Sequence, residues 1–381
     1  MTRQHPSDSL IFAPVGIAHL TGDNADLLRS AAAGRSQLRI TTAAQLNGVP
    51  HFGTVITMLT VFAVTAHASQ VLNLPAIVIF DALENAPAEH ITIDDEDYTR
   101  NVGDLIDAGR LDAGERTAAF ERLLAWAADR SGISYEVRPY DAYQGLRPVR
   151  ECLHHIASRL EDFRPIVAPA DGIVRIRPRC PTCKLMRKSA KGLQITALSG
   201  AVRLDSTCPL HGPYSETVHL DGGGWYDANT PVRSIQKGYL LAAERDMYEA
   251  CSVSVDGADW GGAWHAHVLA PGLAALGVPP PAWPVSIFTP LVVDRTGGKL
   301  SKSLYVARGA YADLPAQFLD LNVLLDTHGE DVFDVAWTEV TRWAAEPRRL
   351  HRSYTVDYLR ALLETGLPVP FEQTGQASRI A

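Results

Sequence analysis

Residues 37–54 read Q-L-R-I-T-T-A-A-Q-L-N-G-V-P-H-F-G-T, and this stretch decides the fold. Its first six residues, 37–42, include β-branched and apolar side chains and predict a strand. The Asn-Gly pair and the proline that follow predict a turn. Residues 55–69 then carry apolar side chains at helical spacing. A strand, a glycine-containing turn and a helix open a nucleotide-binding α/β unit, because the helix N-terminus offers free N–H groups to a phosphate.

The segments that follow continue this alternation of strands and helices. A buried strand at 76–80 ends at Asp81, and further strands are predicted at 134–138, 251–255 and 285–293. This order predicts an α/β fold with a doubly wound parallel sheet, in which ligands bind outside the carboxyl ends of the strands. Helices are expected at 112–130, 149–163, 233–246, 268–276, 314–325, 332–345 and 354–365, and an acidic surface loop at 89–98.

The composition excludes several classes of protein. The 381 residues are 46% hydrophobic and 20% charged, with a formal net charge of −8, which argues against a protein that coats nucleic acid. No uninterrupted apolar run approaches about 18 residues, so no membrane-spanning helix is expected. The N-terminus lacks the apolar region of a signal peptide. Five cysteines with a close pair among them favour a cytoplasmic protein with a metal site over a disulfide framework.

Two short cysteine motifs predict a zinc site. The first is Cys180-Pro-Thr-Cys183 and the second is Cys208-Pro-Leu-His211-Gly. Each places two ligands two residues apart, and together they can arrange three thiolates and one imidazole tetrahedrally around Zn²⁺. Because four protein ligands leave no open position, the metal is expected to be structural and to fold a small insert. The other two cysteines are expected to be buried apolar residues.

The predicted insert is locally basic. Between residues 175 and 204 the chain has eight lysines and arginines and no acidic residue. Such a patch can bind a phosphate backbone or an acidic partner. A solvated face on a small domain explains it equally well.

Two stretches near the end of the predicted sheet carry groups suited to a nucleotide. Residues 294–305 read D-R-T-G-G-K-L-S-K-S-L-Y, and two lysines and two serines on a glycine-rich loop can follow a polyphosphate whose charge shifts during reaction. Residues 257–259 read G-A-D after a predicted strand, where a carboxylate can receive two ribose hydroxyls or instead cap a helix. Of His265 and His267, at most one can face the same site from a regular helix.

These motifs, taken in order, resemble a known family. N-G-V-P-H-F-G-T at 47–54 resembles the HIGH signature of class I aminoacyl-tRNA synthetases, and G-G-K-L-S-K-S at 297–303 resembles their KMSKS signature. The segments between them look most like class I lysyl-tRNA synthetases, with a weaker similarity to methionyl enzymes over 256–303. The resemblance covers about 36–310 and implies a Rossmann-like catalytic core.

The resemblance assigns roles to the first of the two signatures. It implies that His51 contacts the ATP phosphates and that Gly53 lets the adenine approach the backbone. Thr54 stands where the family has a second histidine or an asparagine, so it departs from the pattern but keeps a hydroxyl donor. Gly257 and Asp259 match the residues that hold the nucleoside.

The second signature and the substrate pocket follow by the same comparison. Lys299 and Lys302 would bind the β- and γ-phosphates as pyrophosphate leaves, with Ser301 and Ser303 donating hydrogen bonds and Mg²⁺ accompanying the ATP. An acidic residue in the pocket would favour a lysine-like substrate, although Asp81 can also simply cap a turn. The residues expected to line the pocket are Thr42, Gln45, Asp81 and Trp225.

The resemblance also sets the expected domain organisation. We expect an N-terminal extension at 1–35, two halves of a catalytic domain at 36–165 and 223–310, a zinc-binding insert at 166–222 and a helical region at 311–381. The segment after the second signature looks too short for the anticodon-binding domain of the family.

Three functions are therefore open. The chain can activate an amino acid with ATP and pass it to a small acceptor in specialised metabolism. It can instead charge a tRNA through the acceptor end, or serve as a non-catalytic regulatory or tRNA-sensing module. The two signatures favour an AMP-forming ligase over the third function, because a binding module does not need groups that act on the transition state.

Replacement of Lys302 tests the second signature. Lys302→Ala is expected to lower the rate of amino-acid activation by well over about tenfold, because a charge that stabilises the leaving pyrophosphate is lost. The free energy of unfolding should hardly change, since a loop lysine has little packing to lose. ATP–pyrophosphate exchange measures the first effect and urea denaturation the second. An unchanged exchange rate would contradict the assignment.

Overall fold

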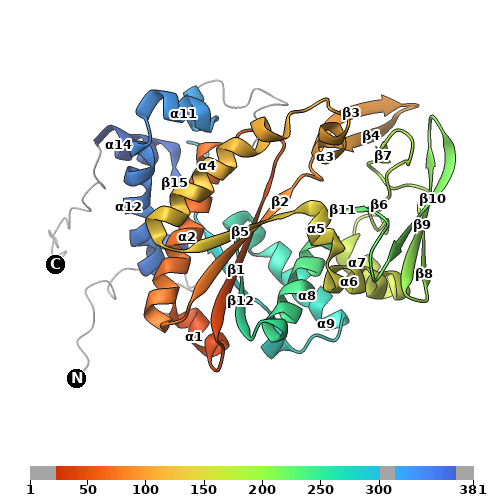
Figure 1. Ribbon diagram of the computed structural model, residues 1–381, viewed down its shortest axis with the longest axis horizontal. Coiled ribbons are helices and arrows are strands. Elements are labelled where there is room, and N and C mark those ends of the chain that lie inside the picture. Colours follow the sequence, from red (N-terminus) through yellow and green to blue (C-terminus); the bar gives the residue numbers. More distant parts are fainter. Residues whose placement is uncertain (1–22, 301–313, 366–381) are drawn as a thin grey trace, which may run out of the picture.

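The computed structural model describes residues 23–300 and 314–365, and its centre is a five-stranded parallel sheet (Figure 1). The strand order is β13-β12-β1-β2-β5, so the chain begins in the middle, builds one side and then returns to build the other. The predicted doubly wound sheet is confirmed. The strands are β1 (Gln37–Gln45), β2 (Ala76–Leu83), β5 (Ser134–Pro139), β12 (Ala250–Gly257) and β13 (Val285–Thr289).

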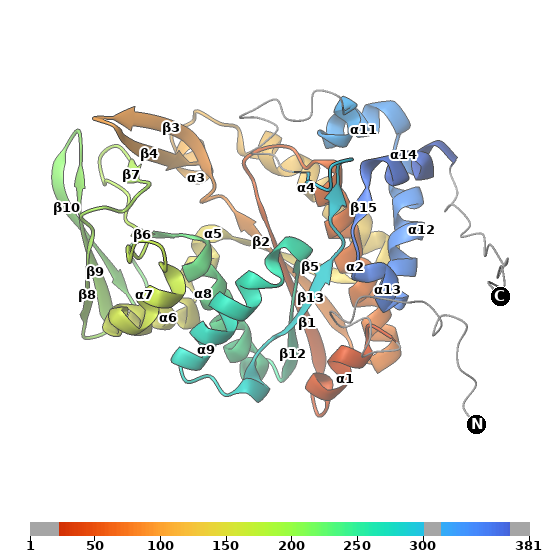
Figure 2. The same cartoon turned by 180° about the vertical axis from the view of Figure 1, so that it is seen from behind.

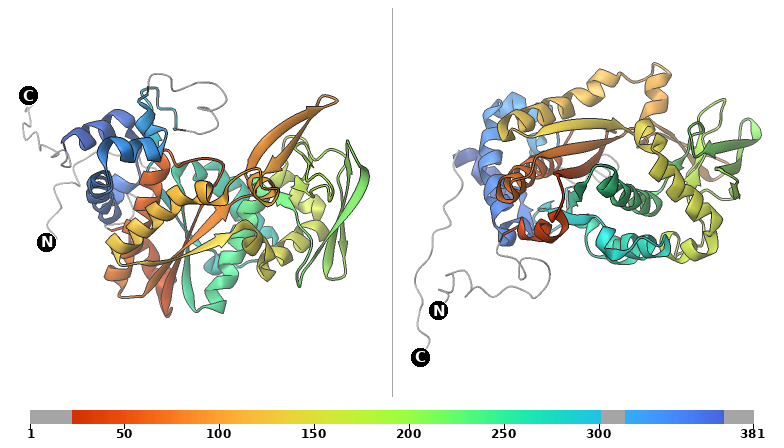
Figure 3. Two further views of the ribbon diagram at one scale, coloured as in Figure 1. Left: turned by 45° about the horizontal axis from the view of Figure 1, so that its top comes forward. Right: turned by 60° about the horizontal axis from the view of Figure 1, so that its bottom comes forward.

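The two faces of the sheet are covered by different helices, as the alternation of side chains along β1 requires (Figure 3). Leu38 and Ile40 point to one face and join the core cluster built around α2 (Phe52–Leu72) and α4 (Ala113–Ser131). Arg39 points to the other face, where it lies 3.9 Å from Glu244 of α8 (Thr230–Met247). One face is therefore apolar, and the other contains buried charged groups that need partners.

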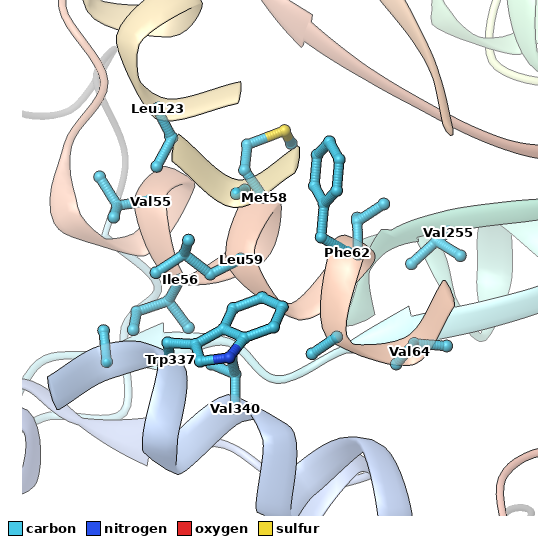
Figure 4. Packing of buried hydrophobic residues seen from close by; sticks show 14 of the residues in the cluster. Val55, Ile56, Met58, Leu59, Phe62, Val64, Leu123, Val255, Trp337 and Val340 are labelled. Carbon is cyan, nitrogen blue, oxygen red and sulfur yellow. The ribbon is translucent and has the colours of Figure 1, made fainter. Parts of the chain in front are cut away.

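The helices near the C-terminal end of the chain complete the core. Helix α12 (Asp331–Ala345) packs along α2, and Trp337 and Val340 lie against the side of α2 that carries Ile56 and Leu59 (Figure 4). The predicted helices in this region are confirmed, except that the first, expected at 314–325, begins seven residues later and ends three residues later, at 321–328. The elements are α11 (Leu321–His328), α12, α13 (Pro347–Leu350), β15 (Tyr354–Thr355), which pairs with β14 (Val292–Val293), and α14 (Val356–Thr365).

Helix α2 corrects one expectation from the sequence. It is 21 residues long with a mean hydropathy of 1.6 over its most apolar window, so by length and composition it could cross a membrane. Threonines, a histidine and a glycine interrupt the apolar run, but the remaining residues are apolar enough to keep the mean hydropathy high. In the structure 61% of that window is buried, because α2 is enclosed by the sheet, α4 and α12. The packing of a central core helix accounts for its composition.

The acidic loop expected at 89–98 is a β-hairpin, so that prediction was wrong. Strands β3 (Pro87–Ile93) and β4 (Glu96–Asn101) pair antiparallel around Asp94 and Asp95, whose φ angles are 50° and 60°. Two consecutive residues at positive φ make the tight turn that suits a two-residue hairpin, and aspartate tolerates this conformation. Pairing of β4 with β7 (Met186–Arg187) joins the hairpin to the insert (Figure 2).

The insert itself is built on a three-stranded antiparallel sheet at the end of the molecule opposite the C-terminal helices (Figure 1). Its strands are β8 (Gln194–Leu198), β9 (Ala201–Cys208) and β10 (Gly212–His219). Two short strands, β6 (Ile176–Arg177) and β11 (Asp227–Ala228), pair with each other where the insert leaves and rejoins the rest of the chain.

Three predicted elements are divided in the structure. The helix expected at 149–163 breaks at Arg159, whose backbone is not helical. The strand expected at 285–293 is interrupted at Pro290, because proline has no N–H for the ladder. The helix expected at 268–276 begins with a π-helical turn, His265–Leu269. The remaining helices are α1 (Asp26–Ala32), α3 (Val102–Asp107), α5 (Tyr140–Gly145), α6 (Arg147–Ser158), α7 (Leu160–Val167) and α9 (Ala270–Ala275).

The contact between α12 and α2 should dominate the stability of the core. Trp337→Ala is expected to lower the free energy of unfolding by about 3–5 kcal/mol, because it opens a large cavity beside α2. Val323→Ala in α11 is the control, since that side chain is 37% exposed and should change stability little. Denaturant unfolding measures both. A loss below about 1 kcal/mol for Trp337→Ala would show that α12 does not support the core.

Candidate functional site

A cavity of about 420 Å³ opens at the carboxyl edge of the parallel sheet. It lies where the strand order reverses, between β1 and β12, which is the usual ligand position in doubly wound folds. The ends of β1 and β2 line it, together with the segments that follow β1, β12 and β14 and one face of α8. Of the predicted site residues within the described part of the chain, the cavity brings together Gln45, His51, Gly53, Thr54, Asp81, Gly257, Asp259 and Lys299.

His51 sits at the start of α2 and caps it. Its Nδ1 accepts a hydrogen bond from the backbone N–H of Thr54 at 3.3 Å, so the imidazole is held at the positive end of the helix dipole. A Cβ atom at Gly53 would lie 2.9 Å from Cε1 of His51 and 3.5 Å from Cβ of Val292. A side chain at this position would push the imidazole out of its place at the start of α2. This end of the cavity offers N–H donors to an anion.

Asp259 and Lys299 come from distant segments and contact each other. Nζ of Lys299 lies 2.5 Å from Oδ2 of Asp259, with side-chain exposures of 42% and 36%. Asp259 does not cap a helix, because the turn it belongs to (Ala258–Trp260) has three residues and no side-chain cap. A Cβ at Gly257 would approach Oδ1 of Asp259 to 2.6 Å, so the glycine makes room for this carboxylate. A partly exposed pair of this kind is weakly held and can separate when a ligand binds.

The loop before Lys299 is ordered by Asp294. Its carboxylate accepts hydrogen bonds from the backbone N–H groups of Thr296 at 2.8 Å and Gly298 at 2.9 Å, while Gly297 takes a φ of +83°. Lys299 then forms a β-bridge with Val293, which fixes where its side chain begins. The other predicted phosphate ligands, Ser301, Lys302 and Ser303, lie outside the described residues.

Two predicted pocket residues lie away from the cavity. Thr42 is buried within β1, because the strand extends three residues beyond its predicted end. Trp225 is stacked under the guanidinium of Arg179 at 4.4 Å, and its Nε1 donates to Asp141 at 2.9 Å. Neither residue lines the cavity at the sheet edge.

Several cavity residues were missed from the sequence. Trp260 and Trp264 form an aromatic wall, with ring centroids 5.8 Å apart. His265 lines the cavity and His267 does not, in agreement with the expectation that only one of them faces the site. Arg233 and Lys237 on α8 also line it, and their spacing of four residues within a predicted helix was a signal for a shared face.

The carboxylates deep in the cavity already hold cations. Arg138 donates to both oxygens of Asp81, at 2.5 and 3.2 Å, and to Glu244 at 2.9 Å. Burial raises the pKa of the Asp81 carboxyl, and the Arg138 guanidinium opposes that rise. Lys237 lies 2.9 Å from both oxygens of Asp256. Asp81 is thus a structural ion-pair partner and does not cap a turn.

The four predicted metal ligands form one cluster in the insert. Their ligand atoms lie within 4.8 Å of one another, on the turn at 180–183 and on the turn between β9 and β10. The sulfurs of Cys183 and Cys208 are 3.5 Å apart, and Nδ1 of His211 lies 3.5 Å from Cys208 and 3.7 Å from Cys180. Tetrahedral Zn²⁺ separates such ligand atoms by about 3.5 to 3.8 Å. The arrangement is compatible with zinc, which would be structural because all four positions come from the protein.

No protein-family model and no curated protein matches this chain. A putative arginyl tRNA synthetase from Campylobacter jejuni is similar to it with a TM-score of 0.36 and 12% identity, over 89% of this chain and 72% of that one.

Two further solved structures have similarities of the same kind. For Mycobacterium tuberculosis methionyl-tRNA synthetase bound by methionyl-adenylate, the TM-score is 0.42 and the identity 13%. The similarity covers 87% of this chain and 68% of that one. For a glutamate-tRNA synthetase from Elizabethkingia anophelis, the TM-score and the identity are 0.32 and 14%, over 72% of this chain and 54% of that one. The chain thus spans about half of the glutamate enzyme. The expected closeness to lysyl enzymes stays a prediction.

Removal of one ligand tests the metal cluster. Cys180→Ser is expected to release zinc and to lower the melting temperature of the protein, because the insert loses the cross-link between its two turns. Cys251→Ser is the matched control: Cys251 is buried in β12, outside the cluster, so zinc should be retained. Elemental analysis gives the metal content. Equal zinc content in the Cys180 variant and the wild type would show that the ligand set is wrong.

Proposed function

We propose that the protein activates an amino acid with ATP, forming an aminoacyl adenylate and releasing pyrophosphate. The observation that supports this is the meeting of His51, Asp259 and Lys299 around one cavity. These residues follow β1, β12 and β14, far apart in the sequence. The resemblance assigns His51 and Lys299 to the phosphates through the two signatures, and Asp259 to the nucleoside through the Gly-Ala-Asp segment. If the lysine motif were a chance feature of a surface loop, Lys299 would not be expected to lie at the same cavity as His51 and Asp259.

The proposed reaction uses the two ends of this nucleotide region differently. An oxygen of the amino-acid carboxylate attacks the α-phosphorus of ATP, and the bond to the bridging oxygen of pyrophosphate breaks. The start of α2, with His51 and Thr54, offers donors to the phosphates. Lys299 exchanges Asp259 for the phosphate oxygens, and Asp259 becomes free to accept the ribose hydroxyls. The charge that develops on pyrophosphate is then met by a lysine already in place.

Magnesium is expected to arrive with the nucleotide. Three aspartates among the described residues line the cavity, and Asp81, Asp256 and Asp259 hold Arg138, Lys237 and Lys299 respectively. None is left as a dedicated ligand, so Mg²⁺ would be bound mainly through phosphate oxygens, where it neutralises their charge.

For the acceptor we propose a small molecule rather than a tRNA. The basic insert was the feature that favoured tRNA, and five of its eight cations form ion pairs with acids of this chain. Those five cations are not free to neutralise a phosphate backbone without losing a partner. The pairs are Arg175–Asp171, Arg177–Asp227, Arg179–Asp104, Lys191–Glu96 and Arg203–Asp205.

Exchange of labelled pyrophosphate into ATP, over a panel of amino acids, tests the proposal. Lys299→Ala should lower kcat for exchange by about 10²-fold, because Lys299 would act mainly on the developing charge. Arg295→Ala is the control on the same loop: Arg295 pairs with Asp357 at the surface and does not line the cavity. Its exchange rate should stay within about twofold of the wild type.

The same assay separates the alternatives. Exchange with an amino acid alone supports activation, and identification of the acylated product after adding amines, thiols or tRNA decides the acceptor. No exchange with any amino acid, with or without tRNA, would overturn both enzymatic functions and leave the non-catalytic module.

A further inference from the structure

One face of α8 forms a wall of the cavity. The lining residues recur at intervals of three and four, as on a single face of a helix. Arg233 and Lys237 lie one turn apart on this face, and Arg233 is the nearer of the two to the helix N-terminus, which Asn229 caps. The α8 residues that line the cavity are Thr230, Arg233, Ser234, Lys237, Gly238 and Leu241.

Among the described residues, the cations of the cavity have partners with the exception of Arg233. Lys237 lies 2.9 Å from both oxygens of Asp256, and Lys299 lies 2.5 Å from Asp259. No hydrogen bond or ion pair of the Arg233 guanidinium occurs within the described part of the chain. A guanidinium presents five N–H donors in a planar fork that matches a carboxylate.

Three acids that lie beside Tyr140 or just before α8 are already engaged. Glu84 accepts from the backbone N–H of Tyr140 at 2.7 Å, and Asp141 accepts from Trp225 at 2.9 Å. Asp227 accepts from Asn85 at 2.6 Å and pairs with Arg177. The positive charge of Arg233 is therefore not cancelled locally, and the helix dipole of α8 adds to it.

Arg233 lies toward the side of the cavity away from Lys299. Helix α8 packs against this side of the cavity, because its Leu240 shares a buried cluster with Tyr140 and Tyr143. Burial is the main cause that raises the pKa of Tyr140, and the Arg233 guanidinium opposes that rise. Tyr140 follows β5, at the far edge of the sheet, whereas Asp259 follows β12, three strands or about 14 Å away. A carboxylate at Arg233 is thus distinct from the carboxylate that would react with ATP.

Tyr143 adds a second unsatisfied group at this side. It follows β5 and lines the cavity, and its buried hydroxyl has no hydrogen-bond partner among residues 23–300 and 314–365. A phenol that is buried stays protonated and can donate to an oxygen. Arginine and tyrosine donors together suit an anionic oxygen ligand, and they do not suit an ammonium group.

We propose that Arg233 binds the side-chain carboxylate of the substrate, so that the amino acid is an acidic one of aspartate or glutamate type. This inference rests on the proposed function, because the ligand of Arg233 is a substrate only if the protein activates an amino acid. It replaces the lysine-like substrate expected from the sequence, which relied on a free acidic group. Asp81 and Asp256 are held by Arg138 and Lys237, and the unpaired charge is positive.

The test compares substrates that differ in side-chain charge. Pyrophosphate exchange is measured with L-glutamate, L-aspartate, L-glutamine and L-lysine, with and without tRNA. An acidic amino acid should be the best substrate, and glutamine, which matches glutamate in shape, should be at least about tenfold poorer in kcat/KM. Arg233→Gln should lower kcat/KM for the acid by about 10- to 100-fold and leave the rate with glutamine nearly unchanged. Arg233→Lys should recover part of the loss.

A matched control lies on the same helix. Arg245→Gln removes the same charge about 18 Å further along α8, outside the cavity, and should leave exchange unchanged. Loss of activity in this variant would mean that the effect at Arg233 is a general one of helix charge or stability.

The outcomes distinguish this inference from the proposed function. Exchange that is best with lysine or a neutral amino acid would overturn the inference and leave the function standing. Equal losses with glutamate and glutamine in Arg233→Gln would overturn the role of Arg233. If no amino acid supports exchange, calorimetric titration with glutamate and glutamine decides: preference for glutamate that disappears in Arg233→Gln supports the site, and no preference overturns it.

Discussion

The packing of α2 between the parallel sheet and α12 is the constraint on which the site depends. Three different elements enclose this helix, and its N-terminus is therefore fixed relative to the carboxyl edge of the sheet. His51 caps that N-terminus, and Gly53 leaves space for its ring beside β14. Displacement of α2 would move the imidazole and the N–H donors together, which connects the stability of the core directly to the geometry of the site.

The opposite face of the sheet follows a second rule, that a buried charge must have a partner. A group of buried charges lies between the sheet and α8, with two positive and two negative members: Arg39, Asp81, Arg138 and Glu244. Removal of one member would lower the free energy of unfolding, because it leaves a buried charge without its partner. This network has a consequence for recognition. It takes Asp81 out of use as a ligand, so that the electrostatic character of the substrate end is set by α8.

Much of this arrangement could be predicted because its signals are local. The strands of the parallel sheet are apolar runs of the right length, and the metal cluster is specified by two short motifs with fixed ligand spacing. The errors come from contacts between segments distant in sequence. The hairpin at 87–101 is joined by a third strand, β7, from the distant insert. The engagement of Asp81 depends on Arg138, which no local pattern connects to it. The sequence predicted Trp225 as a pocket residue, but its ring is covered by Arg179, a residue of the insert.

The two ends of the cavity differ in how their charges are held, and this difference matches two separate tasks. At the nucleotide end, Lys299 and Asp259 are partly exposed and pair with each other, so the interaction is screened and either group can move to a ligand. At the α8 end, the ion pairs of Asp81 and Asp256 are more buried, and Arg233 remains with an uncompensated charge. A movable charge can follow a leaving group through a reaction, whereas a fixed charge discriminates between ligands by their own charge. The cavity therefore separates the groups that would assist chemistry from the group that would select the substrate.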